Sequence, residues 1–224
     1  MKETVAGSGD SREIYAHREL AAIAARWDAR ADSWDHALEG SDCPLNQDGA
    51  YRRFIEVVQR RIARHKEFCA GQGIIDVGCG TGLVLSQVIG AFAWGTGIDI
   101  SREMVRVAEA KNLAKCSFLV GDCFALPTLC SKAGLIVSRG VLLSHYGREH
   151  GVALLKAARA GLAPGGFVIF DFLNEGARTR YHHVPENKTW FTGETVKTMA
   201  RDAGFFAVSI SGGPNRRVLI LIAG

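Results

Sequence analysis

One nine-residue string constrains the fold more than any other feature of the chain: residues 74–82 read Ile-Ile-Asp-Val-Gly-Cys-Gly-Thr-Gly. The apolar run from Ile74 to Val77 is typical of a buried strand, and a helical pattern resumes at Leu83. The three alternating glycines between them would let the backbone turn sharply past a ligand. We therefore predict a strand, a ligand-binding loop and a helix, in that order.

The acid within this string bears on the kind of ligand. The dinucleotide-binding fingerprint Gly-x-Gly-x-x-Gly has its third glycine one residue later than Gly82, and a carboxylate at Asp76 would repel a pyrophosphate. The same carboxylate would attract an ammonium or a sulfonium group. The loop therefore favours a cofactor with a cationic head over NAD.

The string resembles the first motif of the class I S-adenosylmethionine-dependent methyltransferases, Asp/Glu-x-Gly-x-Gly-x-Gly. The resemblance implies that S-adenosylmethionine is the cofactor, with S-adenosylhomocysteine as its product. It also implies cofactor contacts from the residues of this loop, which are Asp76, Gly78, Cys79, Gly80 and Gly82.

Strand and helix patterns alternate after this loop. Strands are expected over 95–100, 117–120, 135–138 and 166–172, with helices opening at Ser101 and lying around 152–160, and a turn at 163–166. Such alternation predicts a parallel sheet with helices on both faces. After a helix capped by Thr192, strands over 205–211 and 217–222 are joined by so short a link that they must be antiparallel. The expected fold is α/β, a Rossmann-like doubly wound seven-stranded sheet, mostly parallel with an antiparallel last strand.

The first seventy residues differ in pattern from the rest. Helices are expected over 14–26 and 27–38, followed by turn signals over 39–49. We interpret 1–50 as an N-terminal helical cap and 51–224 as one methyltransferase domain, which begins with an amphipathic helix from Tyr51 to Phe68.

The charge and composition of the chain limit the kinds of binding partner that we expect. The net charge of +4 is small and the basic residues are scattered, so a nucleic-acid partner is unlikely. No apolar run approaches the ~18 residues of a membrane helix, and the polar N-terminus suggests no export, so we expect a cytoplasmic protein with no membrane contact. The six cysteines lack zinc-ligand spacing, and we expect reduced thiols and no metal site. A homodimer is possible.

Two further acids follow successive predicted strands, where ligands of open parallel sheets bind. Asp99 could accept hydrogen bonds from both hydroxyls of a ribose, and Ile100 could cover an adenine face. Asp122 could take the adenine amino group while the backbone N–H of Cys123 meets a ring nitrogen. The alternatives are a strand-end or helix-capping acid at Asp99 and a turn residue at Asp122.

The resemblance extends from Ile74 to the C-terminus. The segment at Ser138 and Arg139 resembles the family's strand end beside the methionine part of the cofactor, and 162–166 is close to the family's Leu-x-Pro-Gly-Gly. The residues 31–35 resemble Ala-x-x-Tyr-Asp on a helix over the cofactor, with Trp34 in place of Tyr. Trp34 would either contact the cofactor or pack in the core.

The reaction would need a base wherever the acceptor is a hydroxyl or a protonated amine. His145 and Tyr146 follow the fourth predicted strand and are the candidates, although many family members carry histidine at the positions of Leu143 and Ser144. The alternative for His145 is a helix-capping or substrate-shaping role. His183, in the long segment before the last helix, is the third candidate.

The residues around His183 have their own two interpretations. With Arg178 and Arg180 nearby, this segment could recognise a carboxylate or phosphate, or its exposed side chains could have no role.

These observations together predict a methyltransferase that acts on an N or O atom of a small molecule. The family's Asn/Asp-Pro-Pro-Tyr/Phe string, typical of amino-directed methylation of bases and glutamine, does not follow the fourth strand. The alternatives are methylation of an RNA or protein and a non-catalytic S-adenosylmethionine-binding regulator or scaffold.

Overall fold

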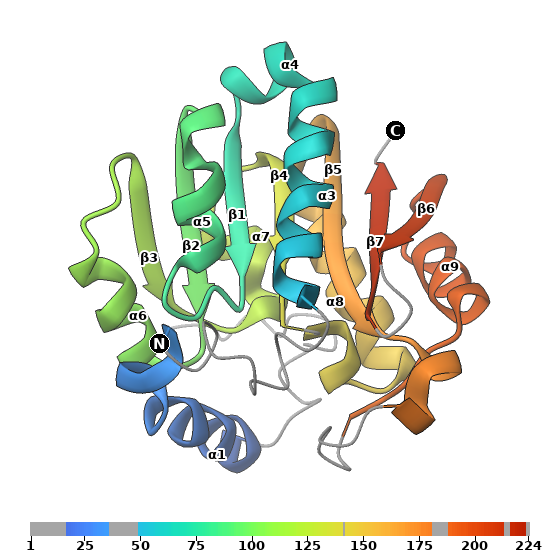
Figure 1. Cartoon of the computed structure of the whole chain (residues 1–224), viewed down its shortest axis with the longest axis horizontal. Coiled ribbons are helices and arrows are strands. Elements are labelled where there is room, and N and C mark those ends of the chain that lie inside the picture. Colours follow the sequence, from blue (N-terminus) through green and yellow to red (C-terminus); the bar gives the residue numbers. More distant parts are fainter. Residues whose placement is uncertain (1–16, 36–48, 141, 181–187, 213–215, 223–224) are drawn as a thin grey trace, which may run out of the picture.

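A seven-stranded sheet in the order β3-β2-β1-β4-β5-β7-β6 organises the protein (Figure 1). The computed structural model describes residues 17–35, 49–140, 142–180, 188–212 and 216–222. The strands are β1 (Gly73–Val77), β2 (Trp94–Asp99), β3 (Cys116–Val120), β4 (Ala133–Ser138), β5 (Leu162–Leu173), β6 (Ala207–Gly212) and β7 (Arg216–Ile222). Strands β1 to β5 pair in parallel, and β7 is antiparallel to both of its neighbours. This confirms the predicted fold class.

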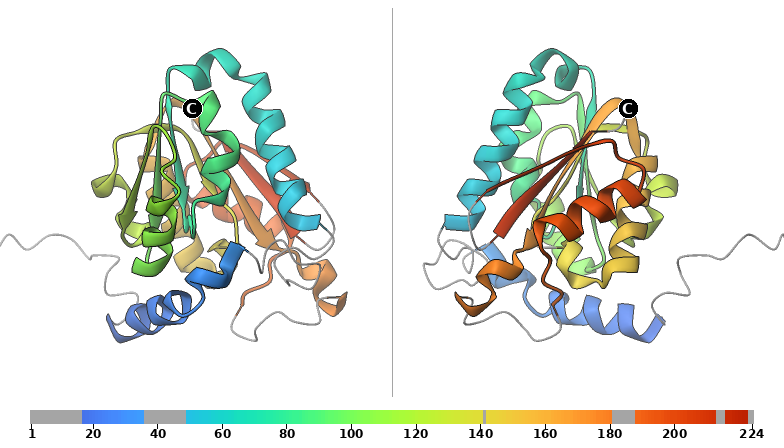
Figure 2. Two further views of the ribbon diagram at one scale, coloured as in Figure 1. Left: turned by 60° about the vertical axis from the view of Figure 1, so that its left-hand side comes forward. Right: turned by 90° about the vertical axis from the view of Figure 1, so that its right-hand side faces the viewer.

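Helices cover both faces of the sheet, as Figures 1 and 2 show. The α-helices are α1 (His17–Asp28), α3 (Ala50–Arg64), α4 (Lys66–Ala70), α5 (Leu83–Val88), α6 (Arg102–Ala110), α7 (Leu126–Leu129), α8 (Arg148–Ala160) and α9 (Gly193–Asp202). The 3-10 helices are η2 (Ala31–Ser33), η4 (Ile89–Ala91), η5 (Cys123–Ala125), η6 (Leu142–His145) and η7 (Glu175–Arg180). Helices α3, α5 and α6 share one apolar cluster with the sheet, and α7, α8 and α9 share the other. No helix within the described ranges is long and apolar enough to cross a membrane.

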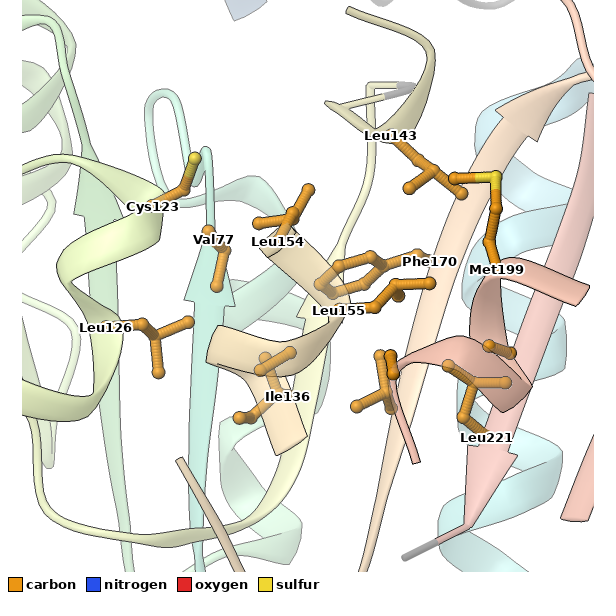
Figure 3. Close-up of a cluster of buried hydrophobic side chains, with 14 of the residues drawn as sticks. Val77, Cys123, Leu126, Ile136, Leu143, Leu154, Leu155, Phe170, Met199 and Leu221 are labelled. Atoms are coloured by element: carbon orange, nitrogen blue, oxygen red, sulfur yellow. The ribbon is translucent and has the colours of Figure 1, made fainter. Parts of the chain in front are cut away.

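The second of these clusters forms the core beneath the site (Figure 3). Phe170 of β5, Leu155 of α8 and Met199 of α9 are fully buried in it. A buried apolar side chain of this size contributes roughly 1.5–3 kcal/mol relative to an exposed one. Leu143 of η6 points toward Met199 and thereby ties η6 to the core.

The N-terminal helix α1 lies across the carboxyl ends of the strands (Figures 1 and 2). It ends at Asp28, whose carboxylate accepts hydrogen bonds from the Ser101 hydroxyl at 2.6 Å and from the Glu103 backbone N–H at 3.1 Å. These bonds and the hydroxyl of Ser101 satisfy donors at the start of α6, and they hold the pKa of Asp28 below its usual value. The helix predicted over 27–38 is therefore wrong at its start, because the chain turns after Asp28 to reach α6 and forms η2 instead.

Strand β5 differs from the sequence-based prediction in one respect. It begins at Leu162, which pairs with Ala133, while Phe167 pairs with Leu135. The predicted turn over 163–166 therefore lies inside the strand as an irregularity, with Gly165 at a φ of +74°. The long amphipathic helix expected up to Phe68 is likewise interrupted at His65, which separates α3 from α4.

Candidate active site

A cavity of about 540 Å³ opens at the carboxyl ends of the strands, with α1 along one side. Its wall is built from α1, the loop after β1, the ends of β2, β3 and β4, and η6. This is where open parallel sheets bind ligands.

The glycine loop is tied to the neighbouring strand. Gly78 and Cys79 donate backbone hydrogen bonds to the carbonyl of Ile98 at 2.7 and 3.0 Å. Gly78 and Gly80 adopt φ values of +69° and +51°, which favour glycine over residues with a side chain. Gly78, Cys79 and Gly80 line the cavity, as the sequence predicts.

Gly82 is the only predicted site residue among the described ones that does not line the cavity. It has a φ of +78°, and a Cβ at this position would lie 3.0 Å from the ring of Phe118. Its place in the structure is therefore a tight packing position where α5 begins, rather than a part of the cavity wall.

Asp76 is the most unusual group in the site. Its side chain is 1% exposed, and within the described structure neither carboxylate oxygen has a hydrogen-bond partner. Burial, assisted by repulsion from Asp99 and opposed by Arg139, raises the pKa of Asp76 to about 8. Since Asp76 faces the cavity, a cationic group placed there would favour its ionised form.

Asp99 is both a loop anchor and a wall residue. Its two carboxylate oxygens accept hydrogen bonds from the backbone N–H groups of Gly80 at 2.8 Å and Ser101 at 2.9 Å. Burial raises its pKa, although these bonds act in the opposite direction. Each oxygen retains a second lone pair, so the carboxylate can still accept bonds from a ligand.

Asp122, which follows β3, also has two roles: it bonds to the backbone and it lines the cavity. Asp122 accepts a hydrogen bond from the Phe124 backbone N–H at 3.0 Å and so caps η5. Asp122 and Cys123 line the cavity beside Ile100 from the end of β2. The turn role that we considered for Asp122 and a place on the wall are thus compatible.

Arg139, at the end of β4, lies over the ring of Tyr51 with 4.7 Å between the guanidinium carbon and the ring centroid. The Tyr51 hydroxyl donates to the carbonyl of Leu83 at 3.1 Å, and burial raises its pKa to about 12. Both residues line the cavity. Tyr51 was not predicted, because no motif marks the first turn of α3.

Two tryptophans, Trp27 of α1 and Trp34 just after η2, form an aromatic part of the cavity wall. Trp34 and Trp27 pack edge to face at 5.3 Å, and the ring of Trp27 is 6.4 Å from that of His145. The indole nitrogen of Trp34 would be 3.5 Å from a Cβ at Gly80. Both tryptophans line the cavity, so Trp34 belongs to the wall.

The candidate bases lie at η6 and just after it. His145 is half-buried and lines the cavity. Tyr146 also lines it, but its ring packs on Phe124 at 5.1 Å and its hydroxyl is 3.3 Å from the thiol of Cys123. Burial raises the pKa of that thiol well above its usual value.

The structure explains why His145 occupies the cavity side of η6. Leu143 is fully buried in the core, and the hydroxyl of Ser144 accepts a hydrogen bond from the backbone N–H of Leu173 at 2.9 Å. His183 lies outside the described residues.

Several wall residues carried no recognisable signal in the sequence. They are Leu20, Ile23, Arg26 and Trp27 of α1, Leu142 of η6, and Lys188. The apolar positions of α1 have helical spacing, but this pattern is equally typical of a helix packed against a core.

Comparisons with known proteins agree with this geometry. Residues 74–166 match the family model described as a methyltransferase domain. The ubiquinone biosynthesis O-methyltransferase of Idiomarina loihiensis is 28% identical over 165 residues, which are 72% of this chain and 61% of that protein. The corresponding protein of Pectobacterium atrosepticum is 30% identical over 171 residues, 72% of this chain and 63% of its own. The chain spans about half to three fifths of the length of most of these relatives.

Solved structures share the fold. Magnesium protoporphyrin IX methyltransferase from Synechocystis with bound S-adenosylhomocysteine superposes with a TM-score of 0.72 at 17% identity, over 91% of this chain and 99% of that one. A DhpI complex with S-adenosylhomocysteine gives a TM-score of 0.68 at 16% identity, over 94% and 99% of the two chains.

Proposed function

We propose that this chain, which belongs to the class I S-adenosylmethionine-dependent methyltransferases, transfers a methyl group from S-adenosylmethionine to an N or O atom of a small molecule. The observation that carries the proposal is Asp76. A buried carboxyl with a pKa of about 8 and no hydrogen-bond partner among the described residues lowers the stability of the protein. Its presence is explained if a cationic ligand binds beside it.

The wall suits the parts of this cofactor in the order of the strands. Asp76 would face its cationic methionine part together with Arg139, which would face the carboxylate. Asp99 would hold the ribose hydroxyls, and Asp122 with the Cys123 backbone N–H would hold the adenine. Ile100 and Trp34 would cover the flat surfaces of the bound molecule.

Bound S-adenosylmethionine supplies a methyl group on a sulfonium: the acceptor's lone pair forms the new bond to carbon as the C–S bond breaks, and sulfur keeps that electron pair as a neutral thioether. The protein must then hold the acceptor in line and exclude water. Where the acceptor is a hydroxyl or an ammonium, its proton must also be removed, and His145 is the residue we assign to this step.

The other two candidates are assigned differently. Tyr146 shapes the wall, since its hydroxyl already contacts the Cys123 thiol and its ring packs on Phe124. A catalytic role for His183 stays a prediction, as do a cytoplasmic location, the division into a cap and a domain, and a homodimer.

A small acceptor is favoured over a macromolecule because α1 lies across the carboxyl ends of the strands, and Trp27 and Trp34 line the cavity there. Two of the relatives are also named ubiquinone biosynthesis O-methyltransferases, and these names point to a small-molecule acceptor.

The proposal is tested by methyl transfer from S-adenosylmethionine labelled in its methyl group to a panel of phenols, amines and carboxylic acids. We expect at least one class to be methylated. For a phenol acceptor, His145→Gln should lower kcat by about 100-fold or more, with an unchanged S-adenosylhomocysteine affinity. Tyr146→Phe is the matched control and should keep most of the activity.

The outcomes separate the alternatives. Cofactor binding without methylation of any compound in the panel would favour the non-catalytic scaffold. Preferential methylation of RNA or protein would favour the macromolecular alternative. A protein that binds neither S-adenosylmethionine nor S-adenosylhomocysteine would refute the proposed function as a whole.

A further inference from the structure

The charges on the cavity wall are divided between its two sides. The acids Asp76, Asp99 and Asp122 all lie at the ends of β1, β2 and β3. The wall residues from α1, the β4 end, η6 and position 188 include bases but, among the described residues, neither Asp nor Glu. One half of the cavity is therefore suited to a cation and the other half to an anion.

Arg26 supplies one of these bases from α1. Its neighbour Trp27 packs near His145 at 6.4 Å, and the 2.6 Å hydrogen bond from Ser101 to Asp28 fixes the end of the helix. These contacts hold Arg26 at the cavity on the same side as the candidate base.

Lys188 supplies the second base from a segment that is pinned to the core. The backbone N–H of Thr189 donates to the carbonyl of Ser144 at 2.8 Å, and that of Phe191 donates to Leu173 at 3.0 Å. Since Ser144 precedes His145 in η6, these bonds hold the segment that begins at Lys188 close to η6, and Lys188 lines the same cavity as His145. Arg139 also lines the cavity, but in the proposed function it faces the carboxylate of the cofactor and is therefore not available to the second substrate.

The part of the wall that carries the two bases also has apolar residues. Leu20, Ile23 and Trp27 of α1 face the cavity together with Leu142 of η6. A flat hydrophobic body would bury its surface here, at a gain of about 25 cal/mol for each Å² removed from water.

We propose that the methyl acceptor is an aromatic molecule that carries a carboxylate or phosphate group, which Arg26 and Lys188 bind while the ring lies against Trp27. This inference rests on the proposed function and adds the chemical class of its second substrate. Charge-assisted hydrogen bonds from an arginine and a lysine distinguish such an anion from a neutral or cationic analogue of the same shape.

The test compares the binding of four probes with one naphthalene skeleton to the protein saturated with S-adenosylhomocysteine, followed by tryptophan fluorescence and by calorimetry. The probes are 1-naphthoate, 1-naphthyl phosphate, 1-naphthamide and 1-naphthylmethylammonium. We expect one of the two anions to bind at least about 10-fold more tightly than the amide and the ammonium compound. Whichever anion binds more tightly identifies the carboxylate or the phosphate as the recognised group.

Charge reversal assigns this preference to the two residues. The double variant Arg26→Glu/Lys188→Glu should lose the preference while its affinity for naphthamide stays within about two-fold of wild type. Arg60→Glu is the matched control, because Arg60 is exposed on α3 and lies outside the cavity wall, and it should keep the preference. Binding of S-adenosylhomocysteine shows that each variant is folded.

Three results would overturn the inference: equal binding of all four probes, tighter binding of the amide or ammonium compound, or an anion preference that survives in the double variant. Absence of binding by every probe to the saturated protein would overturn it as well. Failure to bind S-adenosylhomocysteine is a different result, since it refutes the proposed function itself.

Discussion

Replacing Asp76 by asparagine should stabilise the ligand-free protein at neutral pH. The pKa of this buried carboxyl is about 8 in the folded state, against an ordinary value of 3.8. At pH 7 the folded protein therefore holds a proton on Asp76 that the unfolded chain releases. At about 1.4 kcal/mol per pH unit, this difference costs the wild-type protein up to about 4 kcal/mol at pH 7.

The sign of the pH dependence follows from the raised pKa. As far as Asp76 is concerned, the free energy of unfolding of the wild-type protein is highest below about pH 4, where the carboxyl is protonated in both states. It falls as the pH rises toward 8, where the carboxyl of the folded protein also ionises. The variant lacks this group. The free energy of unfolding of Asp76→Asn minus that of wild type should therefore increase by about 1.4 kcal/mol per pH unit between about pH 4 and 8.

Urea unfolding at pH 5, 6, 7 and 8 measures this difference for the ligand-free proteins. Asp202→Asn is a suitable control, because Asp202 is exposed and contacts Arg148 at 3.0 Å, and its difference from wild type should not grow steeply with pH. A pH-independent difference for Asp76→Asn, or a variant that becomes relatively less stable as the pH rises, would refute the reasoning. Addition of S-adenosylmethionine should stabilise wild type more than Asp76→Asn, because a cation favours the carboxylate.

Two other substitutions test how the site is assembled. Asp28→Ala should lower the free energy of unfolding by about 1–2 kcal/mol in chemical denaturation, since Asp28 accepts hydrogen bonds from Ser101 and from the start of α6. The control is Asp32→Ala, which removes an exposed ion pair with Arg106 and should lower the free energy of unfolding by less than about 1 kcal/mol. Gly82→Ala should lower stability by about 1–3 kcal/mol, because of its positive φ and the ring 3.0 Å away. Gly90 has no positive φ, is exposed and has open space around it, so Gly90→Ala is the control whose thermal unfolding should stay near wild type, and equal losses in the two glycine variants would contradict the strain argument.

Local patterns were sufficient to predict the sheet and its acids. The strand containing Asp76 and the acids at Asp99 and Asp122 are recognisable because each follows a short apolar run. Parallel topology then brings the carboxyl ends of those runs to one edge. Ser101 was likewise predictable as the residue that caps α6, because capping depends on neighbours in the sequence.

The residues that line the cavity from α1 and from position 188 could not be predicted from local sequence patterns. Arg26 and Trp27 face it because Asp28 bonds to Ser101, a residue 73 positions away, and no local pattern specifies that contact. Gly82 was wrongly placed in the cavity wall because the ring that packs against it, that of Phe118, belongs to β3, and no local pattern around Gly82 indicates this contact. The position of Lys188 similarly depends on the bond from Thr189 to Ser144.

The central claim is that the cavity binds S-adenosylmethionine through its three acids, and calorimetric titration tests it most directly. We expect wild type to bind S-adenosylmethionine at one site at pH 7, with little or no heat from NAD, and to release protons as Asp76 ionises. Asp99→Ala should weaken this binding by about 30-fold or more, because the bonds to the ribose and the bond that holds Gly80 in the loop are both lost. Tight binding of NAD without binding of S-adenosylmethionine, or an unchanged affinity in Asp99→Ala, would contradict the account.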